Sequence, residues 1–282
     1  MKVNDVLNIL NDQIIPSIKW KDDPIGLLVG NKNTDVSGIL VSLNPTIAVI
    51  EEAIEKRCNL IVTHHPLFKN RTNRLVEGEY YSDIIMKMIT NDISFIACHT
   101  NYDLVKGGVS YLLAEKFNLK NIKPLVPLNK IENIEDNDFY KLQSKSGDFG
   151  LGVIGELEKE ISLKEFSKTA EKVLSTKTLR IASTSTKKIK KIAVCGGSGS
   201  SFWQYAFNSG ADLFLTSEFN HHLYQEASYY IHVIDATHHS TEIVASKGLF
   251  DYLCTEIKNC KILISLKDTD PVKSINEVKK HP

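Results

Sequence analysis

The sequence predicts an α/β protein made of two similar lobes, each with a mostly parallel or mixed sheet flanked by helices. Two observations support this fold class. Short apolar runs of strand type alternate with segments of helical periodicity before residue 125, and the same alternation returns after residue 188. Polar, histidine-rich motifs stand directly after several of these runs, as expected at the carboxyl ends of parallel strands, where ligands collect.

The first lobe contains three short apolar runs that are typical of buried parallel strands. The segments between them carry apolar residues at helical spacing. Asn44 and Pro45 end the first run and open the helix that follows it. The turn-rich stretch 23–30 is interpreted as a loop with a short strand. The predicted strands are 38–43, 59–63 and 93–98, and the predicted helices are 3–18, 46–56, 82–90 and 107–117.

The pattern loosens between residues 121 and 188, where prolines and an acidic stretch at 132–138 indicate a connection between the lobes. Ser162 and Glu165, at the spacing of a capping box, predict the start of a helix. After this region the strand–helix rhythm returns. The predicted strands are 150–157, 192–195, 212–216, 231–235 and 261–266, and the predicted helices are 162–174, one beginning at 202, and 240–253.

These elements predict how the chain divides into lobes. The first lobe spans residues 1–125 and is completed by the C-terminal segment 240–282. The second lobe spans residues 126–239. The polar tail from Asp268 onward is expected to be ragged.

The composition excludes several classes of protein. Basic and acidic residues balance at 34 each, so net charge does not indicate a nucleic-acid partner. The first residues do not resemble a signal peptide, and no apolar run reaches the ~18 residues of a membrane helix, so we expect a cytoplasmic protein with no membrane partner. The five cysteines include no Cys-x-x-Cys pair, which predicts reduced thiols and a metal held by nitrogen and oxygen.

Histidines gather at the predicted strand ends. Seven of the nine follow four of the predicted strands, which favours a divalent metal site over seven separate structural roles. If the helix predicted at 240–253 begins at about Ser240, His238 and Glu242 lie across its first turn and point the same way. The seven histidines are His64, His65, His99, His221, His222, His238 and His239.

The spacing of these residues suggests two ions. Neighbouring residues leave a strand in opposite directions, so His64 and His65 are expected to serve two adjacent ions. Asp103 supplies a carboxylate, and Glu242 can bridge. Two ions about 3.5–4 Å apart that share a carboxylate activate a water as a nucleophile. A competing structural interpretation makes residues 64–66 a strand-terminating turn whose imidazoles cap a helix.

Six motifs in this order resemble the NIF-three-like proteins, the dinuclear-metal-centre family labelled GTP cyclohydrolase 1 type 2-like. The resemblance covers residues 1 to about 270, and the motifs together are highly specific. The matching segments are 23–30 (Asp-Pro-Ile-Gly-Leu-Leu-Val-Gly), 62–67 (Val-Thr-His-His-Pro-Leu), 98–103 (Cys-His-Thr-Asn-Tyr-Asp), 195–199 (Cys-Gly-Gly-Ser-Gly), 217–222 (Ser-Glu-Phe-Asn-His-His) and 238–242 (His-His-Ser-Thr-Glu).

The resemblance implies a homohexameric ring whose subunits each hold two divalent ions (Zn, Fe, Mn, Co or Ni) in an inward-facing cleft. It implies the short form of the family, because 121–188 is too short for the inserted middle domain of some members. The chain departs from the family at Thr237 and His239, where glycine and tyrosine are usual, and His239 adds an imidazole that can compete as ligand. The implied metal ligands are His64, His65, Asp103, His238 and Glu242.

The leading hypothesis is a metal-dependent hydrolase of a small phosphorylated or nucleotide-like substrate, with Glu218 and His99 as the catalytic groups that move protons. His221, His222 and His239 are assigned to substrate contact or to support of the ligands. Gly197 and Ser198 lie in a loop that either cradles phosphate or makes a tight strand-to-helix turn. A Rossmann-type site is disfavoured because no acidic ribose ligand is found. The alternative function is a non-catalytic metal-binding ring acting as scaffold, metal store or regulatory partner.

Overall fold

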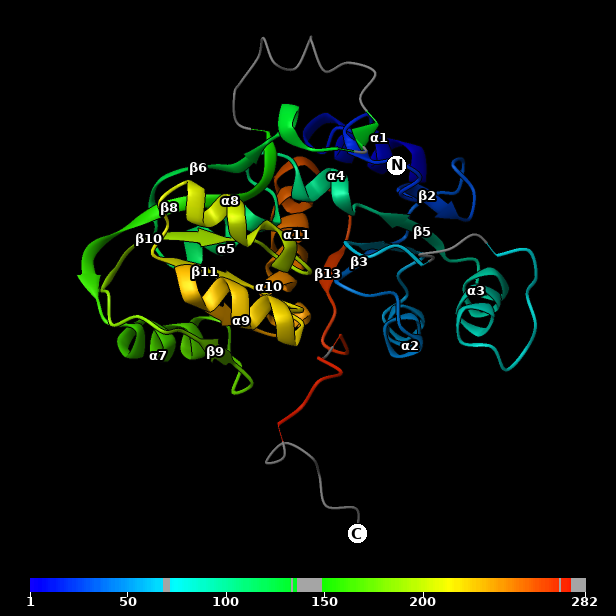
Figure 1. Ribbon diagram of the computed structural model, residues 1–282. Coiled ribbons are helices and arrows are strands. Elements are labelled where there is room, and N and C mark those ends of the chain that lie inside the picture. The colour runs from blue at the N-terminus through cyan, green and yellow to red at the C-terminus, as the bar shows by residue number, and fades with distance from the viewer. Residues whose placement is uncertain (68–71, 133, 136–148, 269, 275–282) are drawn as a thin grey trace. The chain divides into compact units, whose positions relative to one another are not determined.

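The computed structural model describes residues 1–67, 72–132, 134–135, 149–268 and 270–274, which fold into two compact units. The first unit comprises Met1–Val105, Glu132–Lys145 and Ala245–Thr269, and the second comprises Lys106–Ile131, Ser146–Val244 and Asp270–Pro282. Each unit has its own mixed sheet with helices beside it (Figure 1). The predicted fold class is therefore confirmed, whereas the predicted lobe boundaries at 125 and 239 stay a prediction.

The first unit is built on a five-stranded sheet in the order β13-β3-β4-β5-β2. The first four strands in this order are parallel, and β2 is an antiparallel edge strand. A separate antiparallel pair is formed by β1 and β7. The strands are β1 (Lys19–Trp20), β2 (Gly26–Val29), β3 (Ile39–Ser42), β4 (Leu60–Thr63), β5 (Ser94–Ala97), β7 (Ile134–Glu135) and β13 (Ile262–Ile264).

Helices bury the strands of this first sheet. Every residue of β3, β4 and β5 is buried, which explains why their sequences are apolar runs rather than alternating patterns. Figure 1 shows α2 and α3 together beside this sheet, and both contribute to one apolar cluster with Ile61 and Phe95. The helices are α1 (Val3–Gln13), α2 (Ile47–Glu55), α3 (Tyr80–Thr90), α4 (Thr100–Asp103) and α11 (Val244–Glu256), of which α11 begins one residue before this unit.

The carboxyl ends of β3, β4 and β5 are aligned at one edge of the first sheet. Ser42 pairs with Thr63, and Thr63 pairs with Ala97. The ladder extends one step further, because Cys98 N–H donates to the carbonyl of Thr63 at 2.8 Å. The polar residues that follow these strands are therefore neighbours in space although they are far apart in sequence.

The second unit is built on a six-stranded sheet in the order β6-β8-β10-β11-β12-β9. The three strands β10, β11 and β12 are parallel, and the other pairings are antiparallel. β6 lies in the segment predicted to be a connection. It is an edge strand, where the missing N–H groups of Pro124 and Pro127 are tolerated. The strands are β6 (Lys120–Pro127), β8 (Gly150–Ile161), β9 (Arg180–Ala182), β10 (Ile189–Val194), β11 (Leu213–Thr216) and β12 (His232–Asp235).

The helices of the second unit include the predicted capping box. Ser162 Oγ accepts the N–H of Glu165 at 3.2 Å, and Glu165 Oε2 accepts the N–H of Ser162 at 2.8 Å. α8 and α9 contact each other and the parallel strands β11 and β12. The helices are α5 (Val109–Lys116), α7 (Leu163–Val173), α8 (Trp203–Asn208), α9 (His221–Tyr230) and α10 (His238–Glu242), with short 3-10 turns η1 (Leu128–Lys130) and η2 (Ser200–Phe202).

Two local predictions are wrong. The helix expected from about Ser240 begins at His238, because Thr237 caps it: Thr237 Oγ1 accepts the N–H of Ser240 at 3.1 Å. The prediction of a ragged tail is wrong at Asp268, whose carboxylate accepts hydrogen bonds at the end of β3, and stays a prediction for the residues after it. Residues 136–148, 269 and 275–282, which include part of the predicted acidic connection and most of the tail, lie outside the described residues.

None of the helices in the described ranges has the length and apolar character needed to span a bilayer. Cys58, Cys98, Cys254 and Cys260 carry free thiols, as the absence of a paired motif predicts. Burial raises the pKa of the Cys98 thiol to about 12, so this residue beside the histidine motifs stays protonated and does not offer a thiolate.

Candidate metal centre

The first unit brings together His64, His65 and His99, which follow β4 and β5. One nitrogen from each ring can be chosen so that all three lie within 4.8 Å of one another. The ring centroids of His64 and His65 are 5.1 Å apart. The expectation that these two rings point in opposite directions is wrong, because β4 ends at Thr63 and the strand alternation ends with it.

The Nδ1 atoms of His64 and His65 already have acceptors. His64 Nδ1 donates to the carbonyl of Cys98 at 2.8 Å, and His65 Nδ1 lies 2.7 Å from Asn44 Oδ1. Neither Nδ1 atom caps a helix, which disfavours the structural interpretation of residues 64–66. A proton on Nδ1 leaves the lone pair on Nε2, the arrangement found in metal-binding histidines.

A carboxylate faces His64 within the same unit. His64 is fully buried, and its Nε2 lies 3.7 Å from Asp103 Oδ1 at the end of α4. Two donors that bind one ion at about 2.0–2.2 Å each lie roughly 3–4 Å apart. The separation therefore fits a pair of ligands on one divalent ion.

His99 is held by a residue to which the sequence analysis gave no role. His99 Nδ1 donates to Asp23 Oδ1 at 2.7 Å, and Asp23 Oδ2 accepts the Thr100 hydroxyl at 2.5 Å and its N–H at 3.1 Å. Burial raises the pKa of Asp23, but the contacts with His99 and Thr100 outweigh burial and lower this pKa overall. Asp23 is therefore ionised and fixes the orientation of the His99 ring.

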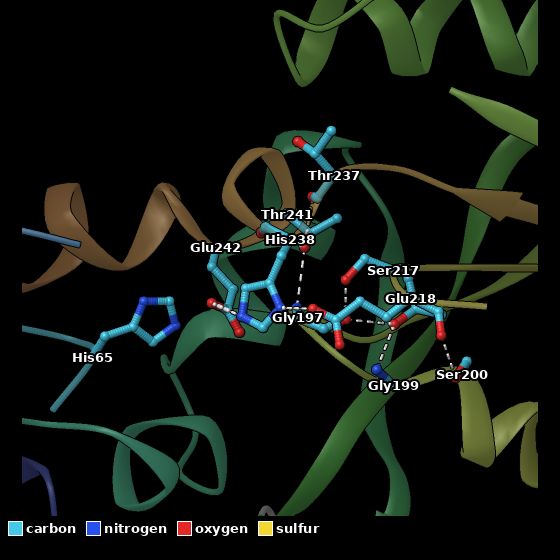
Figure 2. Close-up of polar contacts among 12 residues, drawn as sticks. His65, Gly197, Gly199, Ser200, Ser217, Glu218, Thr237, His238, Thr241 and Glu242 are labelled. Carbon is cyan, nitrogen blue, oxygen red and sulfur yellow. Dashed lines mark hydrogen bonds and ion pairs between the residues drawn. The ribbon is translucent and has the colours of Figure 1, made fainter. Parts of the chain in front are cut away.

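In the second unit, His238 lies between two carboxylates (Figure 2). Its Nε2 is 2.8 Å from Glu242 Oε2 and its Nδ1 is 2.6 Å from Glu218 Oε1. Burial lowers the pKa of His238, but the hydrogen bonds and charges of Glu242 and Glu218 outweigh it and raise the pKa to about 9. An ion that binds Nε2 must displace this proton, because only the unprotonated nitrogen is a ligand.

Glu218 reaches His238 from an unusual backbone conformation, with a φ of +65°. The turn is held by Asp235 at the end of β12. Asp235 Oδ1 accepts the N–H of Glu218 at 3.2 Å, and Oδ2 accepts the N–H of Phe219 at 3.1 Å. Asp235 lies in a predicted strand and was interpreted only as part of it, so its contribution was missed.

Three backbone N–H groups of the glycine-rich loop after β10 are bonded to hydroxyls of the protein itself. This disfavours a phosphate cradle and favours a tight turn, because a cradle needs N–H groups that point at the ligand. The N–H groups of Gly196, Gly197 and Gly199 donate to the hydroxyls of Ser110 (3.2 Å), Thr241 (3.0 Å) and Thr216 (3.0 Å), respectively.

Gly197 also leaves room for the side chain of Glu242. Its φ is +64°, and a Cβ atom placed on it would lie 1.9 Å from Glu242 Oε1. The neighbouring Ser198 is exposed. Gly197 therefore allows the Glu242 carboxylate to pass close to the backbone of the loop, while its predicted role in substrate contact stays a prediction.

The remaining predicted histidines lie elsewhere on the second unit. His221 and His222 are exposed on the first turn of α9, and their rings pack edge to face at 5.5 Å. His239 is half-buried, and its Nδ1 has no hydrogen-bond partner among the described residues. His238 contacts Glu242, and its assignment as a metal ligand in preference to His239 stays a prediction.

Each unit thus offers imidazole nitrogen beside carboxylate oxygen, a donor set that suits divalent first-row metals. The groups in each unit could serve as ligands for a divalent metal ion. The supporting residues were found only in the structure: Asp23 and Asn44 contact the rings of His99 and His65, and Asp235 holds the turn that carries Glu218.

Known proteins similar to this chain share both its sequence pattern and its fold. A protein from Clostridium acetobutylicum named GTP cyclohydrolase 1 type 2 homolog is 33% identical over 280 residues, covering 97% of this chain and 98% of that protein. A crystal structure of a Staphylococcus aureus protein is 31% identical with a TM-score of 0.86, covering 98% of this chain and 99% of that one. The reduced HcgD structure from Methanocaldococcus jannaschii is 27% identical with a TM-score of 0.76, covering 94% and 97% of the two chains.

The family and its short form follow from these comparisons. A relative from Staphylococcus aureus, also named GTP cyclohydrolase 1 type 2 homolog, aligns at 28% identity over 369 positions that cover 98% of this chain and all of that protein. This chain has only 282 residues, so part of that relative has no counterpart here. The family model described as Duf34/NIF3 (NGG1p interacting factor 3) matches residues 1–271. The chain belongs to the Duf34/NIF3 family.

Proposed function

We propose that the chain binds two divalent metal ions through five side chains and hydrolyses a small phosphorylated or nucleotide-like substrate. The observation that carries the proposal is the way four imidazoles are held: Nδ1 of His64, His65, His99 and His238 each has an acceptor. In addition, Nε2 of His64 and of His238 faces a carboxylate. This is the arrangement of ligands prepared for metal. The proposed ligands are His64, His65, Asp103, His238 and Glu242.

The proposed chemistry divides between the ions and the protein. When bound, the ions would lower the pKa of water and offset negative charge that develops on the substrate. His99, oriented by the Asp23 carboxylate at 2.7 Å, is proposed to accept or deliver a proton. Glu218 contacts His238 directly and is proposed to orient it as well as to exchange protons. The metals considered are Zn, Fe, Mn, Co and Ni, all of which accept mixed imidazole and carboxylate ligands.

A second candidate is a metal-binding protein without turnover that acts as scaffold, metal store or regulatory partner. One observation favours it: three N–H groups of the glycine-rich loop are bonded to the protein's own hydroxyls, which weakens the case for a phosphate subsite there. A panel of phosphoesters and nucleotides tested with the loaded protein separates the two candidates. Turnover of any member supports the hydrolase, and no turnover of any member supports the second candidate.

The Glu242→Gln variant tests the metal proposal. Glutamine keeps the shape of the side chain but removes the charge, so we expect the metal content to fall from about two ions per chain toward one or none. Elemental mass spectrometry on protein purified without an affinity tag or chelator measures this content. The matched control is Glu226→Gln, an exposed carboxylate on α9. Equal metal content in both variants would contradict the assignment of Glu242.

We also propose that the chain forms the homohexameric ring implied by its family resemblance. Multi-angle light scattering after size exclusion should then give six times the 31.7 kDa of one chain. A monomer or dimer that persists at micromolar concentration, with and without metal, would contradict the ring.

A further inference from the structure

The carboxylate of Asp268 is hydrogen-bonded to the residues that follow β3 in the first unit. Asp268 Oδ2 accepts the N–H groups of Leu43 and Asn44, the latter at 2.9 Å, and Oδ1 accepts the side-chain amide of Asn44 at 3.0 Å. The other side of that amide faces His65, whose Nδ1 lies 2.7 Å from Asn44 Oδ1. Three polar groups therefore form one chain from the C-terminal segment to the imidazole.

Donor and acceptor rules fix the direction of every bond in this chain. An ionised carboxylate only accepts hydrogen bonds, so the amide atom that faces Asp268 must be the NH2 group of Asn44. The carbonyl oxygen of that amide then faces His65, and it too only accepts. His65 Nδ1 must therefore carry the proton, which leaves the lone pair of the neutral ring on Nε2.

We propose that Asp268, acting through Asn44, is a positioning residue that sets the tautomer of His65. The carboxylate orients the amide, the amide holds the proton on Nδ1, and Nε2 is kept ready to bind a cation. The tautomer follows from hydrogen bonds alone, whereas its value for metal binding rests on the proposed function.

The proposal predicts that Asp268→Asn reverses the donor-to-acceptor direction of the hydrogen bonds that link residue 268, Asn44 and His65. The new side chain must turn its oxygen toward the two backbone N–H groups, so its NH2 group faces Asn44. Asn44 then flips, turns its oxygen toward residue 268 and presents its NH2 group to His65. His65 Nδ1 becomes an acceptor, and the proton moves to Nε2.

Exchanging the two polar residues should restore the original direction. In the double variant Asn44→Asp, Asp268→Asn, the NH2 group at 268 donates to the carboxylate at 44. That carboxylate accepts from His65 Nδ1, as the amide oxygen does in the natural protein. The net charge is the same as in the natural chain, so a simple loss of charge cannot explain a rescue.

Nitrogen-15 NMR of the histidine rings tests this in metal-free protein, with the His65 signals assigned by their loss in His65→Gln. We expect protonated Nδ1 in the natural protein, protonated Nε2 in Asp268→Asn, and protonated Nδ1 again in the double variant. Affinity for added Zn²⁺ should fall roughly 10- to 100-fold in Asp268→Asn and recover in the double variant. A His65 tautomer that is the same in all three proteins would overturn the proposal.

Glu52→Gln is the matched control. The buried Glu52 carboxylate holds the same C-terminal segment, accepting the Ser265 hydroxyl at 2.5 Å and the N–H of Lys267 at 3.3 Å. This variant loosens the segment and should leave the His65 tautomer unchanged. If it shifts the tautomer as Asp268→Asn does, the effect is general loosening and the proposal fails. Failure to bind metal with the predicted tautomers intact would overturn only the proposed function.

Discussion

Alanine at position 197 should remove metal from the second unit as effectively as the loss of the Glu242 carboxylate. A Cβ atom at this position would lie 1.9 Å from Glu242 Oε1 and 2.8 Å from its Cδ, so the carboxylate must move. The positive φ of +64° adds backbone strain of about 1 kcal/mol or more for any residue with a side chain. We expect the free energy of unfolding to fall by about 1–3 kcal/mol and metal content to fall to the level of Glu242→Gln.

Gly78→Ala separates these two causes. Gly78 also has a positive φ, at +87°, but a Cβ atom there meets nothing within 4 Å. This variant carries the strain without the collision, so it should lose stability in urea denaturation while keeping its metal. If Gly197→Ala also retains full metal content, the loop moves instead of Glu242, and the close approach has no role in metal binding.

The elements that could be predicted from sequence are those whose signal is local. The buried strands β3, β4 and β5 are continuous apolar runs because every residue in them is buried, and such runs are visible in any window. The polar residues after them were placed together by one rule, that parallel strands end at the same edge of a sheet. That rule correctly brought His64, His65 and His99 together.

The residues that orient these histidines could not be predicted in the same way. Asp268 is 224 positions away from Asn44 in sequence, and Asp23 is 76 positions away from His99. No periodicity or spacing connects residues so far apart, and each lies in a stretch that looks like an ordinary turn or tail. Only the packing of the sheet shows which carboxylate meets which imidazole.

The directions in which side chains point were predicted less well, because they depend on where each strand or helix begins and ends. The expectation for His64 and His65 used strand geometry, but both residues lie past the end of β4. The expected helix start at Ser240 missed the cap by Thr237, so the first turn contains His238 itself. In both cases the residue types were correct and the error was one of element boundaries, which depend on hydrogen bonds that the sequence does not display.

Replacing Asp235 by alanine should have the largest effect on stability. This carboxylate is fully buried and accepts hydrogen bonds from the N–H groups of Glu218 and Phe219 and from the hydroxyl of Tyr224. It also forms an ion pair with Arg180 at 3.0 Å. Alanine leaves these donors without their acceptor, so we expect a loss of about 3 kcal/mol in the free energy of unfolding, measured by urea denaturation.

The same variant tests whether Asp235 acts on the site as well as on the fold. Glu218 is held in its left-handed conformation by Asp235, and Glu218 contributes to the high pKa of His238, which is about 9. If the turn relaxes, the Glu218 carboxylate leaves Nδ1 and the pKa of His238 in metal-free protein should fall, as followed by NMR titration. Arg180→Gln is the control, because its side chain is 65% exposed and its ion pair contributes about 1 kcal/mol or less.

The two readouts together decide what Asp235 does. A residue that only stabilises the sheet would lower the free energy of unfolding and leave the pKa of His238 at about 9. A residue that positions Glu218 would change both, whereas Arg180→Gln should change neither by much. An unchanged His238 pKa in a folded Asp235→Ala protein would restrict Asp235 to the core, and Glu218 would then depend on its own backbone for its place beside His238.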